Sequence, residues 1–213
     1  AAAPGLPAAL VDRHGRRVTF SALARAAGLS PQTARRRLLE LEQAGTLRLL
    51  WPLGEAADKR GAPVLYLRDP PLVTDLPEGE RWRARLVEAI AALAEGDGGR
   101  IGCLVRTHGG VVEPVVGLPG AEGPALVGFL LWPDTLGRRG VWATLTRAQR
   151  QGLLRQGFVL YRGSRAYFSS ARVAVVPDRF FLEQYAAWMA AALDPSPEAL
   201  QQLMRRCNAP RVC

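Results

Sequence analysis

The first part of the chain alternates between short helical patterns and turns. A helix is predicted over residues 6–13, and residues 18–20 favour a β-strand. Residues 21–27 form a second predicted helix with Ser21 as its cap, because a short hydroxyl side chain satisfies a free N–H at a helix start. A turn is expected at Gly28.

A third helix has clear start and stop signals. Ser30 is a suitable cap, and Pro31 follows at the first helical position, where its missing N–H is no handicap. The pattern runs to Ala44 and stops at Gly45, a residue that accepts the left-handed conformation that ends many helices. The sequence therefore predicts one helix from Pro31 to Ala44.

Two strands with a polar connection follow this helix. Residues 46–51 and 63–67 are rich in apolar residues, and residues 52–62 between them contain glycine and charges. The order helix, short strand, helix, turn, helix, hairpin is that of a winged helix-turn-helix.

The segment from Ala24 to Gly45 resembles winged-helix transcriptional regulators of the MarR and ArsR kind. Their pattern is a small-residue turn followed by Ser-x-x-Thr, a small residue, arginine, leucine, Leu-Glu and a closing glycine. The corresponding residues here are Ser30, Thr33, Ala34, Arg36, Leu38, Leu41, Glu42 and Gly45. The resemblance covers about 60 residues and implies a DNA-binding domain.

The helical wheel agrees with this resemblance. At about 100° per residue, Ala34, Leu38 and Leu41 fall on one side and are expected to pack inward. Gln32 and Arg36 then point almost opposite, where a helix in the major groove meets base edges with its first turns.

The outward residues have the chemistry needed to read DNA. Gln32 can pair with adenine, and Arg35 or Arg36 with guanine, each pair giving about 1–3 kcal/mol of discrimination. Thr33 is placed to contact a phosphate near the positive end of the helix. The alternative is that Arg35, Arg36 and Arg37 form a solvated face that pairs with glutamates of the same helix, with Arg37 the most structural of the three.

The connection between the two strands carries basic residues. Lys59 and Arg60 at its tip are expected to lie on the DNA backbone or in the minor groove, and to add salt-dependent affinity. Glu55 and Asp58 in the same loop weaken this interpretation, and a loop kept in solution by its charges is the alternative.

The charge distribution points the same way. The formal net charge is +9, and cutting after Asp69 gives 11 basic and 6 acidic residues before the cut (+5) and 17 and 13 after it (+4). The shorter part has about twice the charge per residue, which favours an anionic polymer as its partner. Most of the preference for arginine over lysine is attributed to a GC-rich genome.

The remaining residues predict a second, α+β domain. A helix is expected over 81–95, strands over 101–106, 111–116 and 125–132, a helix over 145–156, a hairpin of 158–161 with 167–168, a strand over 172–176, and helices over 179–193 and 196–206. Eight of the 15 aromatic residues lie between Phe158 and Trp188. They indicate a core with dimer contacts, or alternatively a ligand pocket lined by aromatics.

Catalysis and metal binding are poorly supported. The two histidines, the single lysine in the wing and the absence of a Gly-Lys phosphate loop give no catalytic set, so no catalytic residue and no cofactor are expected. The set Cys103, His108, Cys207 and Cys213 has unusual spacing for zinc, so no metal site is assigned.

A cytoplasmic location is expected from the same sequence. No apolar run is long enough for a membrane span, and no leader for export is expected. The three cysteines form no disulfide framework, which fits a reducing compartment.

The sequence thus predicts an α+β chain in three parts: a winged helix-turn-helix DNA-binding domain at residues 1–70, a linker at 71–80, and a separate α+β domain at 81–213. The function expected is that of a sequence-specific regulator of transcription that binds double-stranded DNA as a homodimer, with a small-molecule effector left open. The alternative is a replication initiator or other DNA-maintenance factor whose helix 145–156 and basic hairpin form a degraded second winged helix.

Overall fold

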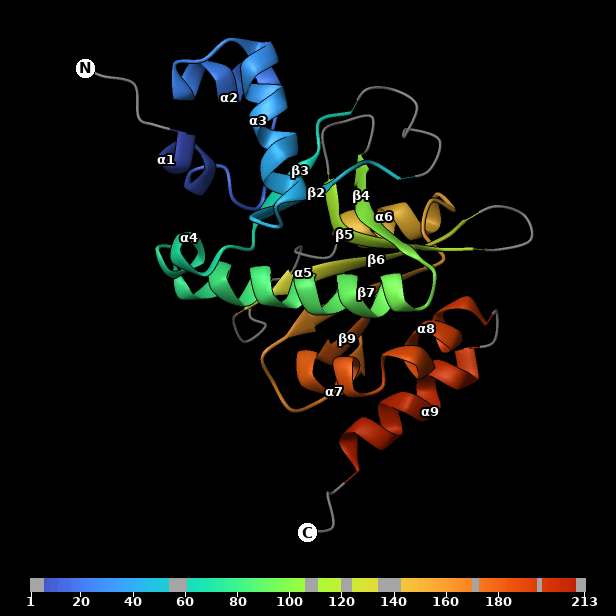
Figure 1. Cartoon of the computed structure of the whole chain (residues 1–213). Helices are drawn as coiled ribbons and strands as arrows, with labels where there is room; N and C mark the ends of the chain where they lie inside the picture. Colours follow the sequence, from blue (N-terminus) through green and yellow to red (C-terminus); the bar gives the residue numbers. More distant parts are fainter. Residues whose placement is uncertain are drawn as a thin grey trace.

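The computed structural model shows two β-sheets, each covered by helices (Figure 1). It describes residues 6–53, 61–105, 111–119, 124–133, 143–169, 173–194 and 197–209. In these residues no helix is both long and apolar enough to cross a membrane.

The N-terminal part has the predicted winged helix-turn-helix order. Its elements are α1 (Leu6–Val11), β1 (Arg16–Arg17), α2 (Phe20–Ala27), α3 (Pro31–Gln43), β2 (Leu47–Leu50) and β3 (Val64–Leu67). The three strands form one antiparallel sheet in the order β1-β3-β2. The predicted strand 18–20 and the Ser21 cap are wrong, because Thr19 is the residue that caps α2, accepting a hydrogen bond from the Ala22 N–H at 3.2 Å.

The C-terminal part is built on a six-stranded mixed sheet in the order β4-β5-β6-β7-β9-β8. Its elements are α4 (Pro70–Thr74), α5 (Glu78–Gly96), β4 (Arg100–Val105), β5 (Val111–Leu118), β6 (Ala125–Trp132), α6 (Ala143–Arg150), β7 (Gln156–Tyr161), β8 (Tyr167–Phe168), β9 (Ala174–Pro177), α7 (Asp178–Glu183), α8 (Tyr185–Leu193) and α9 (Pro197–Asn208). The α+β fold class is therefore confirmed.

The central strand β7 separates two cores. Phe158 and Leu160 pack against α5, α7, α8 and α9, whereas Val159 and Tyr161 face α6 and belong to the other core. This follows from the period of two along a strand, and every residue of β7 is buried because both faces are covered. Figure 1 shows α5 in front of the sheet and α6 behind it.

The predicted hairpin of residues 158–161 with 167–168 is wrong. Strand β7 pairs in parallel with β6 and β9, while β8 pairs antiparallel with β9. An apolar strand that buries both faces belongs in the middle of a sheet rather than at an edge. Without that hairpin, α6 and the strand after it do not form a second winged helix.

The residues predicted as a linker pack against the N-terminal core. Part of the segment 71–80 belongs to α4 and part to the start of α5, and Leu76 is only 4% exposed. The Arg81 side chain donates to the carbonyls of Thr74 and Leu76 at 3.0 and 3.1 Å. These contacts tie the segment between the two sheets.

The predicted helix over 179–193 is two helices. Gln184 lies between α7 and α8 with φ −126° and ψ 30°, outside the helical region. The aromatic rings of the two helices nevertheless pack together, because Phe181 lies 5.9 Å from Tyr185 and 6.2 Å from Trp188, centroid to centroid.

Both faces of the β2–β3 hairpin are buried. One face packs with α1, α2 and α3, and the other packs with α5 and the large sheet. The alternation follows the strand period: the first face carries Leu47, Leu49, Leu65 and Leu67, and the second carries Leu50, Val64 and Tyr66.

Two arginines on the second face fix the hairpin to α5. Arg48, only 16% exposed, pairs with Glu88 at 2.8 Å and with Glu95 at 2.6 Å. Arg68 pairs with Glu88 at 2.8 Å. Charge-assisted contacts of this geometry hold the hairpin in one position along α5.

The end of β2 also joins the edge of the large sheet. The Cys103 N–H donates to the Trp51 carbonyl at 2.9 Å, and the Cys103 carbonyl accepts from the Leu53 N–H at 2.8 Å. The Cys103 thiol donates to the Leu50 carbonyl at 3.2 Å. The two sheets are thus connected by backbone hydrogen bonds as well as by side chains.

A buried histidine lies where the N-terminal part meets α5. The His14 Nδ1 accepts from the Leu67 N–H at 3.1 Å, and its Nε2 lies 3.9 Å from the Glu80 carboxylate. The pKa of His14 is lowered to about 4, mainly by burial; Glu80 opposes the shift and the nearby Arg83 contributes to it. A proton on Nδ1 would also face the Leu67 N–H, so the folded chain requires a neutral ring.

Gly102→Ala should weaken the connection between the two sheets. A Cβ at Gly102 would lie 2.3 Å from the Trp51 carbonyl oxygen and 2.6 Å from Leu53 Cγ, so backbone must move. We expect the free energy of unfolding to fall by about 1–3 kcal/mol in urea denaturation. The matched control is Gly96→Ala in α5, where nothing lies within 4 Å and no loss is expected. Equal stability of the two variants would contradict the connection.

His14 should make the protein less stable in acid. Its pKa is lowered in the folded chain, from 6.5 to about 4, so its contribution is complete above pH 6.5 and is lost as the pH falls towards 4. We expect wild type to lose about 3 kcal/mol more than His14→Asn between pH 7 and 4, because asparagine accepts the Leu67 hydrogen bond without titrating. Parallel unfolding curves for the two proteins would show that His14 does not set the acid dependence.

Candidate nucleic-acid interface

The position of α3 is set at both ends and along its inner face. The Ser30 hydroxyl accepts from the Thr33 N–H at 3.1 Å, as the sequence predicted. Gly28 and Gly45 have φ values of 69° and 75°, which glycine adopts without strain. Ala34 and Leu38 are fully buried against α2 and the hairpin, so the helix cannot rotate without opening the core.

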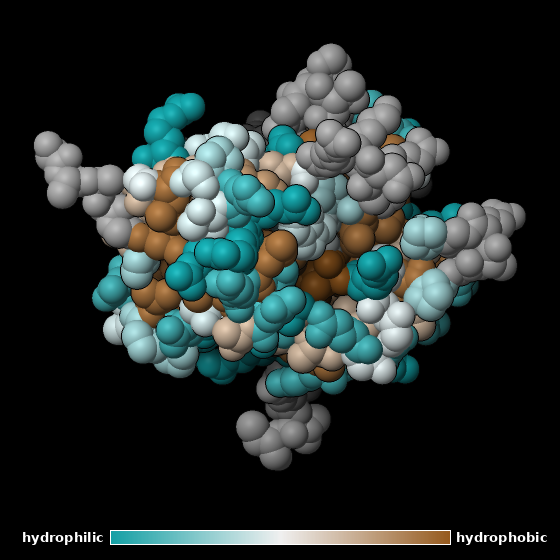
Figure 2. Space-filling view, turned by 45° about the horizontal axis from the view of Figure 1, so that its top comes forward, coloured by the Kyte–Doolittle hydropathy of each residue, from teal (hydrophilic) through white to brown (hydrophobic). Residues whose placement is uncertain are grey.

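The opposite face of α3 is open to solvent. Gln32, Arg35 and Arg36 are all exposed, in agreement with the helical wheel. Thr33 is partly buried, and its hydroxyl lies 2.8 Å from the Ser30 hydroxyl. Across the face that carries the N-terminal part, hydrophilic residues are interspersed with hydrophobic ones (Figure 2).

Glu40 interacts with two of the three consecutive arginines. It lies 3.1 Å from the Arg37 guanidinium and 3.6 Å from that of Arg36. The Arg36 side chain is 67% exposed, so this longer contact is weak and leaves Arg36 free to reorient towards DNA. Glu42 accepts from the Leu49 N–H at 3.1 Å and serves the fold instead. Of the three, Arg37 has the clearest structural contact.

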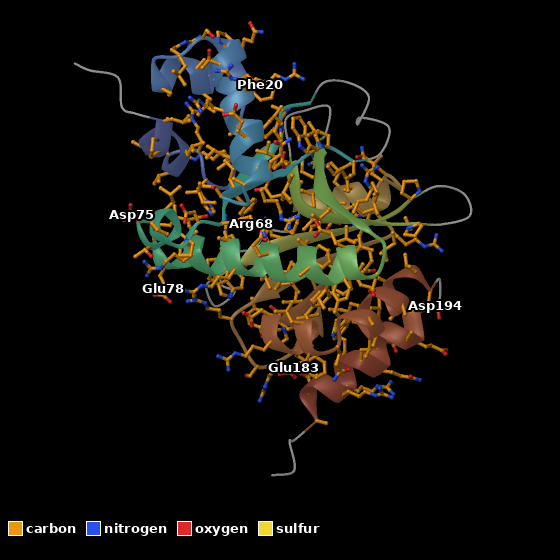
Figure 3. All side chains as sticks on the ribbon, viewed as in Figure 1. Phe20, Arg68, Asp75, Glu78, Glu183 and Asp194 are labelled. Carbon is orange, nitrogen blue, oxygen red and sulfur yellow. The ribbon has the colours of Figure 1, made fainter. Side chains whose placement is uncertain are left out.

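Arg35 has a different neighbour. Its guanidinium carbon lies 5.8 Å from the centre of the Phe20 ring. Phe20, labelled in Figure 3, is the first residue of α2. Stacking on an aromatic ring restricts the side chain and leaves its N–H groups available. The α2–α3 pair therefore presents Arg35 in a limited set of orientations.

The sequence prediction missed the arginines of β1. Arg16 and Arg17 are exposed, and Arg17 Nε donates to the Ala62 carbonyl at 3.5 Å, where the wing connection returns. The only signal in the sequence for an exposed strand at Arg16 and Arg17 was their closeness to the β-favouring residues 18–20. Lys59 and Arg60, predicted at the tip of the wing, lie outside the described residues.

Four exposed arginines of the N-terminal part have no acidic partner among the described residues. They are Arg16, Arg17, Arg25 and Arg35. Such an arrangement is suited to the phosphates of a nucleic acid.

Six of the eight aromatic residues between Phe158 and Trp188 are buried, whereas Tyr167 and Phe168 are exposed. Phe158, Phe181 and Trp188 are completely buried, and the Phe158 ring is 5.3 Å from Phe181 and 5.9 Å from Trp188, centroid to centroid. The rings thus occupy the space that an aromatic-lined ligand pocket would need.

The four residues weighed for zinc do not come together as far as the structure describes them. Cys103 is buried between the two sheets and Cys207 is on α9, while His108 and Cys213 are outside the described residues. In the described ranges no three histidine, cysteine, aspartate or glutamate side chains lie close enough together to bind a metal ion.

The comparison with known families agrees with this geometry. Residues 9–48 match the family model for winged helix-turn-helix DNA-binding domains. No curated protein and no solved structure matches the chain at a significant level. The matched segment contains the end of α1 and all of β1, α2 and α3, so the N-terminal part of the chain carries a winged helix-turn-helix DNA-binding domain.

Proposed function

We propose that this chain is a sequence-specific regulator of transcription of the MarR or ArsR kind, which reads double-stranded DNA with α3. The observation that carries the proposal is a capped helix whose inner face is locked by Ala34 and Leu38 while Gln32 and Arg36 are exposed. A helix held in this way presents fixed donors and acceptors to base edges.

Each contact residue has a separate role in this proposal. Gln32, Arg35 and Arg36 meet bases, and Thr33 meets a phosphate at the start of α3. Lys59 and Arg60 of the wing, with Arg16 and Arg17 beside it, neutralise the backbone. The last group adds affinity without selecting a sequence.

The active species in this proposal is a cytoplasmic homodimer, because the chain acts on DNA and one module of this size covers little of it. No catalytic activity is assigned to the chain. The alternative is a replication initiator or other DNA-maintenance factor, which binds as a single chain over a longer site.

Arg36 and Lys59 should differ in what they contribute to binding. Arg36→Ala should weaken binding to the selected site by about 1–3 kcal/mol, or roughly 5- to 150-fold, with a smaller loss on random duplex. Lys59→Ala should weaken both by the same factor and lower the salt slope by about 1. The matched control is Arg37→Ala, whose side chain pairs with Glu40. Equal losses on both duplexes for Arg36→Ala would reduce it to a phosphate contact.

The footprint should distinguish the regulator from the initiator. A regulator gives a two-fold symmetric footprint with two chains per site, measured by nuclease protection and by the mass of the complex. One chain on a long asymmetric site would overturn the regulator in favour of the initiator. Cleavage of labelled DNA in magnesium or manganese would overturn the assignment of a non-catalytic protein.

A further inference from the structure

Helix α6 is the layer on the face of the large sheet opposite α5 (Figure 1). It buries Leu145 and Ala148 in the second core and exposes Arg147 and Arg150 in its last turn. The turn that follows leads to Arg155, which is exposed at the start of β7. We call Arg147, Arg150 and Arg155 the α6 surface.

The sequence around this surface contains no acidic residue. Residues 135–177 include eight arginines and neither aspartate nor glutamate, although the whole chain has 19 acidic residues. That stretch has a formal charge of +8, which nearly equals the +9 of the whole chain. The basic excess of the C-terminal part is therefore concentrated in one segment.

The layer on the other face of the sheet is mixed in charge. Helices α7, α8 and α9 with their connections carry three arginines and four acidic residues between residues 178 and 209. Glu183 and Asp194 mark this layer in Figure 3. A genomic preference for arginine would raise the arginine content of residues 135–177 and of residues 178–209 alike. It therefore does not explain why the first stretch has no acidic residue.

The arginines of the α6 surface form no ion pair with any residue in the described ranges. Arg162, in the same acid-free stretch, shows the contrast, because it pairs with Glu78 at 2.6 Å and lies over the Trp82 ring. Arg162 fastens α5 to the sheet, whereas the α6 surface has no such structural contact.

The helix dipole explains part of the pattern. Basic residues in a last turn stabilise a helix by about 0.3–1 kcal/mol at an exposed site. That effect accounts for Arg147 and Arg150. It does not account for Arg155, which lies beyond the helix, or for the missing acidic residues.

We propose that the α6 surface binds the phosphate backbone of duplex DNA, as a second contact beside the winged helix. The argument is charge complementarity: exposed arginines that form no ion pair with any described residue match a polyanion, and planar guanidinium groups suit phosphate. Duplex DNA is the occupant we choose because the same chain carries a winged helix-turn-helix DNA-binding domain, which supplies a first contact to that polymer. The contact rests on the proposed function only in that the chain binds duplex DNA, and it selects no sequence.

The test compares two triple variants that remove the same charge. The first is Arg147→Gln, Arg150→Gln and Arg155→Gln; the matched control is Arg179→Gln, Arg205→Gln and Arg206→Gln on α7 and α9, where all three arginines are exposed. Binding of each to a random-sequence duplex is measured as a function of salt. The slope of log K against log salt is negative, and each phosphate contact contributes about 0.9 to its magnitude. This magnitude should decrease by about 2–3 for the first variant and stay unchanged for the control. Equal slopes for the two would overturn the proposal.

Further variants distinguish the loss of a DNA contact from a loss of folding and from binding of RNA. The triple lysine variant, Arg147→Lys with Arg150→Lys and Arg155→Lys, should keep the wild-type slope, because this variant retains the positive charge. If the glutamine triple does not fold by circular dichroism, the single variants Arg147→Gln and Arg155→Gln should each lower the slope by about 1. A slope that changes on an RNA hairpin but not on duplex DNA would overturn the proposal in favour of RNA.

The proposed function fails independently of this contact. Gln32→Ala with Arg36→Ala should abolish the preference for a selected site while the loss caused by the α6 substitutions persists on random duplex. If the α3 substitutions leave that preference intact, the regulator proposal is overturned and the α6 contact still stands.

Discussion

The fold depends on a β-hairpin that is buried on both faces. The β2–β3 strands give one set of side chains to the core beneath α3 and the alternate set to the core beneath the large sheet. Because successive side chains on a strand point in opposite directions, a shift by one residue would exchange the two sets. The register of one short hairpin therefore fixes both halves of the protein against each other.

This arrangement ties the winged helix-turn-helix domain to the C-terminal part. The inner face of α3 packs on the hairpin, and the hairpin is held by the ion pairs of Arg48 and Arg68 and by the backbone of Cys103. The segment between the two sheets is packed as well, through Leu76 and the Arg81 hydrogen bonds. A change in the position of the large sheet would move the hairpin and the exposed face of α3 with it.

Arginine serves two different purposes in this chain. Arg48, Arg68 and Arg162 pair with glutamates of α5 and hold elements together. A second group is exposed and forms no ion pair with any described residue; its members are Arg16, Arg17, Arg25, Arg35 and the three arginines of the α6 surface. Arg36 lies between the two groups, because its contact with Glu40 is long and its side chain is exposed. A count of basic residues does not separate these groups, because only the partner of each side chain distinguishes a structural arginine from one available to a phosphate.

Local signals were sufficient to predict helix α3. The Ser30 cap, Pro31, the Ala34 and Leu38 positions and Gly45 act within a few residues of one another, so the sequence alone determined the helix and its exposed face. Strand partners depend instead on contacts between distant segments, and the sequence did not predict that β7 lies between β6 and β9. Three features were decided only by the tertiary structure, because each depends on which residues are buried together. They are the position of the β1 arginines beside the wing, the packing of residues 71–80, and the burial of the β2–β3 hairpin in both cores.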